Sequence, residues 1–574
     1  MTDLLLLHGT VVSMDRQRSI IEDGAIAIAG SQIVEVGASA DLMGRHQGAR
    51  TIDCRGRAII PGLVDAHGHG GHSLLKTLGC DTPSLWMRIV TPAYFHYTTR
   101  SFWHADGLVS AIERLRAGVT CGTSVIGSVP RSDDPSFAIA HARAYADVGI
   151  REIVCVGPAG LPWPHPVTRW DTGKPQRFEA SFEEMLAGAE ATIESCNGTA
   201  DGRILVYLTP FTIVPSIDPS NPTPPDRATK LTAEDRLQAR RVREVAAKRG
   251  VRIHSDAFAG MVRMAAQDRE NALLGTDVHL QHCIGLSLEE VDILAETGTH
   301  MSHSAGGRAP VLSMLSKGVN VAITTDGTAP RQTFDLLQAA RQVQFAHQLL
   351  NDDRYLLPPG RLLEMITIDA AKALGLDARI GSLEAGKEAD IAIVNLRQPH
   401  LVPNWMVVHR LIYEAVGHDV ETVIVGGRIL MQDSRIASVD TDAILEEGER
   451  EAWELVERKE SAANSSAWRR KASLPAAWTR PGLTILTPTS ASRSTVSRIR
   501  DAGTRPSPTS VSVKTLSLRP QFSRPSARTR LHSSSSGCAS PQNHRLRLSS
   551  RTPISARISA IRSKAATEGR TPAV

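Results

Sequence analysis

The feature of this chain that most restricts its fold is an alternation of short apolar runs with longer amphipathic stretches. The later stretches carry helix signals: Thr232 with Asp235 and Ser287 with Glu290 form capping-box patterns, and a glycine follows each stretch. Buried parallel strands joined by helical crossovers produce this alternation. Eight repeats predict an α/β fold, the (β/α)₈ TIM barrel, with a doubly wound sheet as the alternative. The eight apolar runs are 62–69, 119–126, 151–156, 203–208, 251–256, 277–283, 299–304 and 320–326.

Polar side chains end five of these eight runs. The C-terminal ends of the strands meet at one face of such a barrel, and active sites lie there. A single histidine at a strand end is more often structural, but five such ends at one rim indicate a site. Imidazole nitrogens with one carboxylate suit a divalent ion such as Zn²⁺ or Fe²⁺ with one position left for water. In chain order the residues are His67 with His69, His254, His282, His303 and Asp326.

A neighbouring histidine, His279, lies three residues before His282. Strict alternation along a strand would turn it to the opposite face. We therefore expect His279 to have a structural role.

The charge of the chain is unevenly distributed. The chain has 65 basic and 60 acidic residues. Residues 462–574 contain 20 of the basic residues and two of the acidic ones, so residues 1–461 contain 45 basic and 58 acidic residues. The segment 462–574 is rich in Ser, Arg, Pro and Thr and has no sustained apolar period. It is therefore predicted to be a disordered basic tail, either a functional one or an out-of-frame extension of the reading frame. Because this tail lacks interleaved aromatic residues, we do not expect it to bind nucleic acid.

Cysteine usage and hydropathy indicate a cytoplasmic protein. The seven cysteines are scattered without CxxC spacing, which argues against a disulfide framework and a cysteine-bound zinc knuckle. The opening "MTDLLLLHGT" is too short for a signal peptide, and no run of about eighteen apolar residues exists. We therefore expect no association with a membrane.

Several motifs occur in an order that resembles the amidohydrolase superfamily of metal-dependent hydrolases. They are "IIPGLVDAHGHGG", "LQHCIGLSLEEVDILAETGTHMSHS", "GVNVAITTDGT" and "ITIDAAKALGLDARIGSLEAGKEADIAIVNL". The resemblance covers roughly residues 1–440 and is strongest to the branch of cytosine, guanine and adenosyl-type deaminases and triazine hydrolases. The chain is also similar to the phenylurea and thiocarbamate hydrolases of this superfamily.

The resemblance implies a domain organisation. Residues 1–58 and 381–440 would form a composite β-sandwich domain from both chain ends, and their alternating apolar pattern with Gly-rich turns agrees. Residues 59–380 would form the barrel, residues 441–461 a C-terminal helix, and residues 462–574 the tail. The family's habit also implies a homo-oligomer.

The resemblance also assigns roles to the residues at the strand ends. Each chain would bind one divalent ion, with zinc expected in preference to iron. The ion would lower the pKa of its bound water and so supply a hydroxide nucleophile. Asp326 would take the proton of that water and His282 would stabilise the developing oxyanion. Asp256 and His303 would contact the substrate, a small molecule. The metal ligands would be His67, His69, His254 and Asp326.

Two departures from the family pattern narrow the expected reaction. The fourth run ends "VYLTPFTIVPS", without the lysine or acid that bridges two metals in binuclear members, which favours one metal, although Asp256 and His282 could hold a second. The deaminases carry a glutamate three residues after the strand-five histidine, and here that position is Ala257. Adding water to a ring C=N carbon requires a protonated nitrogen, whereas a carbonyl oxygen can rely on the metal and His282.

The sequence therefore predicts hydrolysis of a non-peptide carbon–nitrogen bond of amide, urea or carbamate type. Deamination of a nitrogen heterocycle, with Asp256 as the substitute acid, is the alternative. A metal-free scaffold protein is a third possibility, which the filled ligand positions disfavour.

Overall fold

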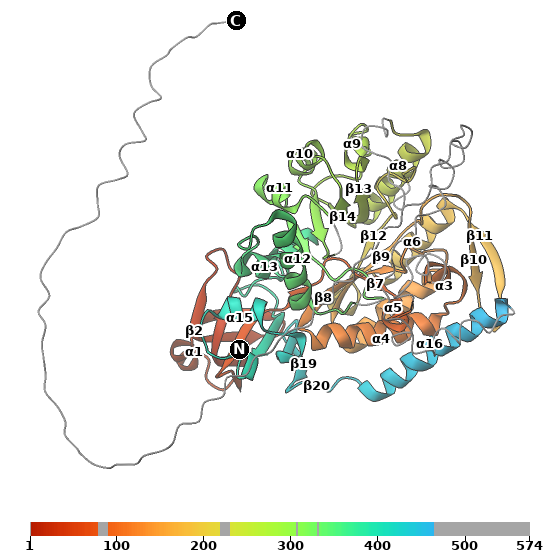
Figure 1. The fold of residues 1–574 in the computed structure, drawn as a ribbon. Helices are drawn as coiled ribbons and strands as arrows, with labels where there is room; N and C mark the ends of the chain where they lie inside the picture. The colour runs from red at the N-terminus through yellow and green to blue at the C-terminus, as the bar shows by residue number, and fades with distance from the viewer. Residues whose placement is uncertain are drawn as a thin grey trace, which may run out of the picture. The chain divides into compact units, whose positions relative to one another are not determined.

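The computed structural model describes residues 2–78, 90–170, 172–217, 230–305, 308–329 and 332–463 (Figure 1). The predicted tail, 462–574, lies outside the described residues except for its first two positions, which end the last helix. Among the described residues, no helix is both long and apolar enough to cross a membrane.

The barrel sheet contains one strand from each of the eight apolar runs, and the strands lie side by side in chain order. All neighbouring strands are parallel, as helical crossovers require. The (β/α)₈ fold expected from the sequence is thus confirmed. The strands are β6 (Leu63–Val64), β8 (Val119–Ile126), β9 (Arg151–Val156), β12 (Ile204–Leu208), β13 (Ile253–Phe258), β14 (Val278–Ile284), β15 (His300–His303) and β16 (Val321–Ile323).

The first and last strands meet at their C-terminal ends. Gly68 forms an isolated parallel bridge with Asp326, and the Asp326 N–H donates to the carbonyl of His67 at 3.1 Å. A further short strand, β7 (His69–Gly70), pairs with β8. The residues between β6 and β7 therefore form a turn that lies against the end of β16.

Helices cover the outside of the sheet (Figure 1). Two begin with the predicted capping boxes: the hydroxyls of Thr232 and Ser287 accept from the backbone N–H of Asp235 at 3.0 Å and Glu290 at 3.3 Å. These helices include α4 (Arg100–Arg116), α5 (Pro135–Val148), α6 (Phe182–Cys196), α8 (Ala233–Arg249), α10 (Leu288–Thr297), α12 (Leu336–Asn351), α13 (Pro359–Met365) and α14 (Ile368–Ala373). Shorter elements in the connections are α3 (Thr91–His96), α7 (Thr199–Gly202), α9 (Met261–Ala265), α11 (Val311–Ser316) and the hairpin of β10 (His165–Arg169) with β11 (Gln176–Ala180).

A second, nine-stranded sheet combines both ends of the described chain. Apolar side chains that alternate along β1 enter two separate clusters, one with Leu4 and Leu6 and the other with Leu5 and Leu7, so both faces of this sheet are covered. The division of the chain at residues 58/59, 380/381 and 440/441 stays a prediction. The strands are β1 (Leu4–Val12), β2 (Ile20–Ala29), β3 (Gln32–Ala38), β4 (Arg50–Asp53), β5 (Arg57–Pro61), β17 (Ile391–Asn395), β18 (Val420–Val425), β19 (Arg428–Gln432) and β20 (Arg435–Ile436).

Three further helices are α1, beside the second sheet, and α15 and α16, near the end of the described chain. The short helix α1 (Ser39–Arg45) packs on β2 and β3, and α15 (Val407–Tyr413) packs against α12 and α13. The long helix α16 (Thr441–Ala463) packs along α4.

Candidate metal centre and active site

The turn between β6 and β7 carries two buried histidines, His67 and His69. His69 Nδ1 donates to the carbonyl of Gly127 at 2.7 Å, which leaves the Nε2 lone pair for another partner. A Cβ on the intervening Gly68 would lie 2.6 Å from a guanidinium nitrogen of Arg114 and 2.9 Å from the carbonyl oxygen of Thr123. Only glycine therefore allows the turn to approach this close to the barrel wall.

Asp326 faces both histidines from the end of β16. Its Oδ1 lies 3.4 Å from His67 Nε2 and 3.3 Å from His69 Nε2, and Ser304 Oγ donates to its Oδ2 at 3.1 Å. The backbone of Asp326 is left-handed, with φ 59°. Burial alone would raise the pKa of Asp326, but His282 and the contacts with His67 and His69 outweigh it and hold the pKa well below its usual value.

A buried ion network lies beneath this pair of strand ends. Asp65 accepts hydrogen bonds from the backbone N–H of Thr325 at 3.0 Å and from its hydroxyl at 2.6 Å. Arg114 lies 3.4 Å from Asp65 and 3.1 Å from Glu152, and all three charged side chains are fully buried. The network ties the residue before Asp326 to the strand that leads into His67.

His254 joins the group from β13 and is fully buried. Its Nδ1 donates to the carbonyl of His279 at 3.0 Å, and its Nε2 lies 2.7 Å from His67 Nδ1. Burial lowers the pKa of His254 to about 4, so the imidazole is neutral near neutral pH. A neutral imidazole oriented by a carbonyl is the form that binds a metal.

The expected orientation of His279 is wrong. His279 and His254 are opposite each other on β14 and β13, and their rings stack 4.6 Å apart, so both point to the same side. Strand alternation fails after this residue because His282 and Cys283 both adopt left-handed backbone angles, φ 69° and 49°. This reversal turns the His282 side chain into the site as well. A structural role for His279 remains, since its ring packs under His254.

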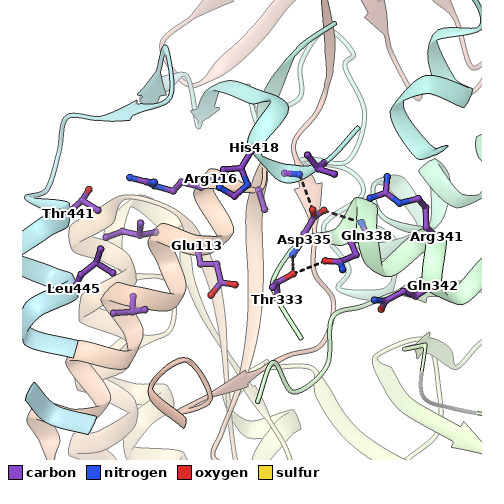
Figure 2. Close-up of a pocket in the computed structure, with 15 residues that line it drawn as sticks. Glu113, Arg116, Thr333, Asp335, Gln338, Arg341, Gln342, His418, Thr441 and Leu445 are labelled. Carbon is purple, nitrogen blue, oxygen red and sulfur yellow. Dashed lines mark hydrogen bonds between the residues drawn. The ribbon is translucent and has the colours of Figure 1, made fainter. Parts of the chain in front are cut away.

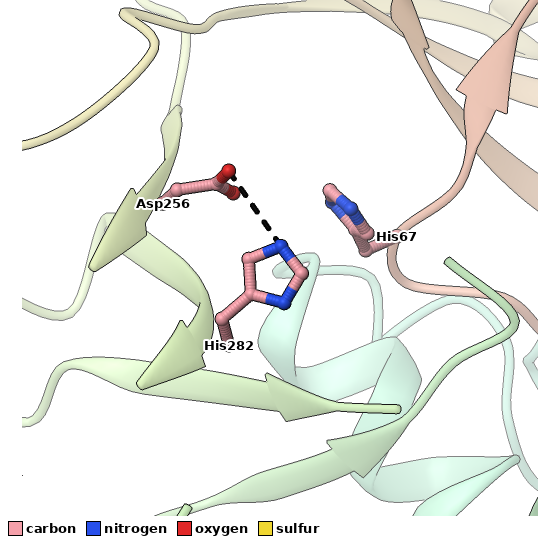
Figure 3. Close-up of side chains that lie close together, drawn as sticks. All are labelled: His67, Asp256 and His282. Atoms are coloured by element: carbon pink, nitrogen blue, oxygen red, sulfur yellow. Dashed lines mark ion pairs between the residues drawn. The ribbon is translucent and has the colours of Figure 1, made fainter. Parts of the chain in front are cut away.

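His282 and Asp256 face His67 from the neighbouring strands β14 and β13 (Figure 3). His282 Nε2 lies 3.7 Å from Asp256 Oδ2, and His282 Nδ1 lies 3.9 Å from Asp326 Oδ2. Phe258 stacks on the His282 ring at 5.4 Å. Burial raises the pKa of Asp256 to about 6, so this carboxyl holds a proton more readily than an exposed one.

Ala257 occupies the position at which the family pattern predicts a glutamate. Along β13 the side chains of His254, Asp256 and Phe258 share one face, and Ala257 belongs to the other. It is fully buried in the main hydrophobic cluster of the molecule. Asp256 is therefore the acid that this strand presents to the site.

His303 ends β15 and has a partner that sequence reasoning missed. Its Nε2 lies 3.0 Å from Nε2 of His347, a buried residue on α12. Burial lowers the pKa of both rings, that of His303 to about 3. Between two neutral imidazoles one nitrogen donates and the other accepts, so His347 determines which tautomer His303 presents. A histidine on a helix follows no strand-end pattern, and nothing in the sequence indicates its position.

The side chains present fit a divalent metal ion. Two groups of three have ligand atoms within 4.8 Å of one another: His67 with His69 and Asp326, and His67 with Asp256 and His282. His67 Nε2 is buried and has no hydrogen-bond partner among the described residues. Imidazoles oriented by backbone carbonyls, those of His69 and His254, and a carboxylate 3.3–3.4 Å from His67 and His69 are a zinc-type donor set. His254 lies next to this donor set, because its Nε2 contacts His67 Nδ1.

Comparisons with known proteins identify relatives of this chain. The chain is 31% identical over 445 residues to a 5-methylthioadenosine/S-adenosylhomocysteine deaminase of Moorella thermoacetica, which covers 74% of this chain and 94% of the relative. It is 28% identical over 481 residues to a 5'-deoxyadenosine deaminase of Methanosarcina mazei, and this match covers 80% of this chain and 100% of the relative.

Solved structures share the fold. An adenosine deaminase from Xanthomonas campestris with bound zinc superposes with a TM-score of 0.67 at 24% identity and covers 79% of this chain and 99% of its own. A zinc complex of the atrazine chlorohydrolase from Arthrobacter aurescens superposes with a TM-score of 0.64 at 23% identity and covers 78% of this chain and 100% of its own.

The model of the family described as "Amidohydrolase family" matches residues 58–430, from β5 through the barrel to β19. This span includes all of the strand-end residues that the sequence singled out. The expected superfamily is thus confirmed, as is the expected class of enzyme. The chain belongs to the amidohydrolase family and is a hydrolase of carbon–nitrogen bonds other than peptide bonds.

Proposed function

We propose that this chain hydrolyses a carbonyl carbon–nitrogen bond, of amide, urea or carbamate type, in a small molecule. The observation that carries the proposal is the position of Ala257. The glutamate that would protonate a ring nitrogen is missing, and its position faces the hydrophobic core. The remaining polar groups, Asp326 and His282, suit a reaction in which negative charge develops on a carbonyl oxygen.

In this proposal His67, His69, His254 and Asp326 hold the metal ion. When bound, a divalent ion acts as a Lewis acid and lowers the pKa of a coordinated water. We infer one ion per chain, with zinc first and iron second, because three imidazoles and one carboxylate form a mononuclear zinc-type set. Zinc bound to the fold neighbours supports this choice.

The side chains of the site transfer the protons and stabilise the charge that develops. Asp326, which its low pKa keeps ionised, is the carboxylate available to accept the proton of the attacking water. The water oxygen forms the new bond to the carbonyl carbon, and His282 donates a hydrogen bond to the oxygen that gains charge. As the carbon–nitrogen bond breaks, the proton on Asp326 passes to the departing nitrogen. Asp256 and His303 orient the substrate.

Deamination of a nitrogen heterocycle is the second candidate function. Asp256 lies in the site and its pKa is raised to about 6 by burial, so it can supply the proton that the missing glutamate would supply. The relatives named above are deaminases of adenosine derivatives. Both reactions use the same metal ligands and differ in the acid that protonates the substrate.

We further propose a cytoplasmic homo-oligomer. The five cysteines in the part of the chain that the structure describes are all free and buried, which suits a reducing compartment. Oligomer formation is inferred from the resemblance to the superfamily, and the partner of the site is a small molecule.

A substrate panel tests the proposed reaction. The purified chain, with its metal content measured on the same sample, is assayed against amides, ureas, carbamates, aminopyrimidines and aminopurine nucleosides. Turnover of a carbonyl substrate with about one metal per chain supports the proposal. Release of ammonia from the ring substrates alone would favour the second candidate.

A further inference from the structure

Helix α12 presents an outward face with almost no charge. Its exposed side chains Gln338, Gln342, Phe345 and Leu349 follow one another at intervals of four, three and four residues, and therefore form one stripe. Phe345 is 64% exposed and Leu349 is 66% exposed. The one charged residue of this 16-residue helix is Arg341, whose guanidinium donates to the carbonyls of Ile412 and Ala415.

The low charge of α12 contrasts with that of another outer helix of this molecule. The outer helix α8, of similar length, carries charged side chains at nine of its 17 positions. Charged residues are depleted at the centre of protein interfaces, where aromatic residues and methionine are enriched. The α12 stripe matches the composition of an interface and not that of a solvated helix.

Neighbouring segments extend this surface. Gln348 Nε2 donates to the carbonyl of Arg354 at 2.9 Å, which ties the loop with Tyr355 to the end of α12. Gln344 Nε2 lies 3.5 Å from the hydroxyl of Tyr413 at the end of α15. The exposed apolar residues of these segments and of the chain leading into α15 are Leu350, Tyr355, Val402, Trp405, Met406, Tyr413 and Val416. Together with the α12 stripe we call them the α12 face.

The α12 face continues into a hollow of about 780 Å³ (Figure 2). Gln338 and Gln342 of the stripe line one side of it, and residues of α4 and of the start of α16 line the other. Val109, Ile112 and Leu445 give that other side an apolar surface. The hollow can receive a side chain from a partner that lies on the stripe.

The exposed area is large enough for a stable contact. The apolar side chains of the α12 face expose about 1,000 Å² in sum, taking roughly 150–250 Å² for a full aromatic side chain and less for the others. Monomeric proteins rarely expose contiguous apolar patches above a few hundred Å². A standard interface buries about 800 Å² per partner.

We propose that the α12 face is an interface between two copies of this chain. The proposal rests on the homo-oligomer inferred above and locates its contact. The α12 stripe itself carries no charge and offers nothing to a strongly charged partner, whereas a two-fold axis beside α12 sets the stripe against its own copy. Alternating intervals of four and three residues are those that packed helices use. The amides of Gln338 and Gln342 can then pair across the axis.

The interface also bears on the site. His347, on the inner side of α12, contacts His303 at the end of β15. A second copy on the outer side would hold α12 in place from behind. The contact would therefore stabilise the helix that orients a substrate-binding histidine, without adding a residue to the site.

Sedimentation of the full chain tests the interface. We expect the wild-type chain to be a dimer or a larger even-numbered oligomer. Phe345→Glu with Leu349→Glu should raise the dissociation constant of the dimer by about 100-fold or more, because each of the two anchor positions contributes about tenfold or more. The matched control is Leu288→Glu on α10, since Leu288 is 61% exposed and lies off the α12 face.

The outcomes separate the two proposals. A double variant that stays fully assembled overturns the α12 interface and leaves the homo-oligomer intact. A monomeric wild-type chain overturns both. Binding of that monomer to lipid vesicles would instead assign the face to a membrane surface.

A cross-linking experiment covers the case in which the double variant fails to fold. Gln342→Cys lies on the exposed stripe, and the cysteines of the described residues are buried. Oxidation should link Gln342→Cys chains into covalent dimers and should leave Leu288→Cys chains unlinked. Equal cross-linking of both variants would overturn the interface.

Discussion

Replacing Thr325 with valine tests whether the buried network beneath Asp326 holds the proposed metal ligands in position. The Thr325 hydroxyl donates to Asp65 Oδ2 at 2.6 Å, and its backbone N–H donates to Oδ1 at 3.0 Å. Valine keeps the shape of the side chain and removes the hydroxyl donor. Because Asp65 is fully buried, water cannot replace the lost hydrogen bond.

The structure sets the size of the effect. A hydrogen bond to a charged group contributes about 1.5–3 kcal/mol, and Arg114 and the backbone N–H remain as partners of Asp65, so we expect a loss of about 2 kcal/mol in the free energy of unfolding. Burial raises the pKa of Asp65, whereas Arg114 and Thr325 lower it, so the valine variant raises this pKa further. Because Asp326 follows directly, we also expect metal affinity to fall by about 10- to 100-fold.

Two assays measure these effects. Urea unfolding of the metal-free protein gives the stability change, and competition with a chromophoric chelator gives the zinc dissociation constant. The control is Thr328→Val, because Thr328 is buried and its hydroxyl has no hydrogen-bond partner among the described residues. If Thr325→Val loses no more stability and no more zinc affinity than this control, the network does not position the ligands.

Three further predictions concern metal, pH and the tail. His67→Ala and His69→Ala should each lose bound metal and activity while keeping the circular dichroism spectrum, and full metal occupancy in either would contradict the proposed site. Burial lowers the pKa of His300 to about 4, below the unfolded value of about 6.5, so its contribution to stability is complete above about pH 6.5 and is lost as the pH falls toward about 4. His300→Gln should therefore lose less unfolding free energy than the wild type between about pH 7 and about pH 5 in urea titrations. Truncation after Ala463 should leave turnover and melting temperature nearly unchanged in a thermal scan, because every proposed ligand precedes this residue.

The barrel and its rim could be predicted because both depend on local sequence signals. Each strand is a short apolar run and the helices carry caps such as Thr232 with Asp235. Parallel strands bring their C-terminal ends to one rim whatever the details of packing. The meeting of His67, His69 and Asp326 follows from this topology alone.

The details of the site could not be predicted because they depend on backbone geometry and on contacts between distant elements. Left-handed angles at His282 and Cys283 change which face each side chain takes, and no pattern of apolar residues reports them. His347 reaches His303 from a helix 44 residues further along the chain. The position of Asp256 is the exception: it could be predicted, because Asp256 lies two residues after His254 on β13 and shares its face.

Without the glutamate, we expect this amidohydrolase to prefer carbonyl carbon–nitrogen bonds to ring amidines. The most direct measurement is kcat/KM of the zinc-loaded chain for an aryl urea and for an aminopurine nucleoside, each with the wild type and with Asp256→Asn. We expect a higher kcat/KM for the urea than for the nucleoside, and only a modest fall in kcat/KM in Asp256→Asn. A chain that releases ammonia from the nucleoside, leaves the urea untouched and loses about 10²- to 10⁴-fold in Asp256→Asn, as expected for a removed general acid, would contradict this expectation.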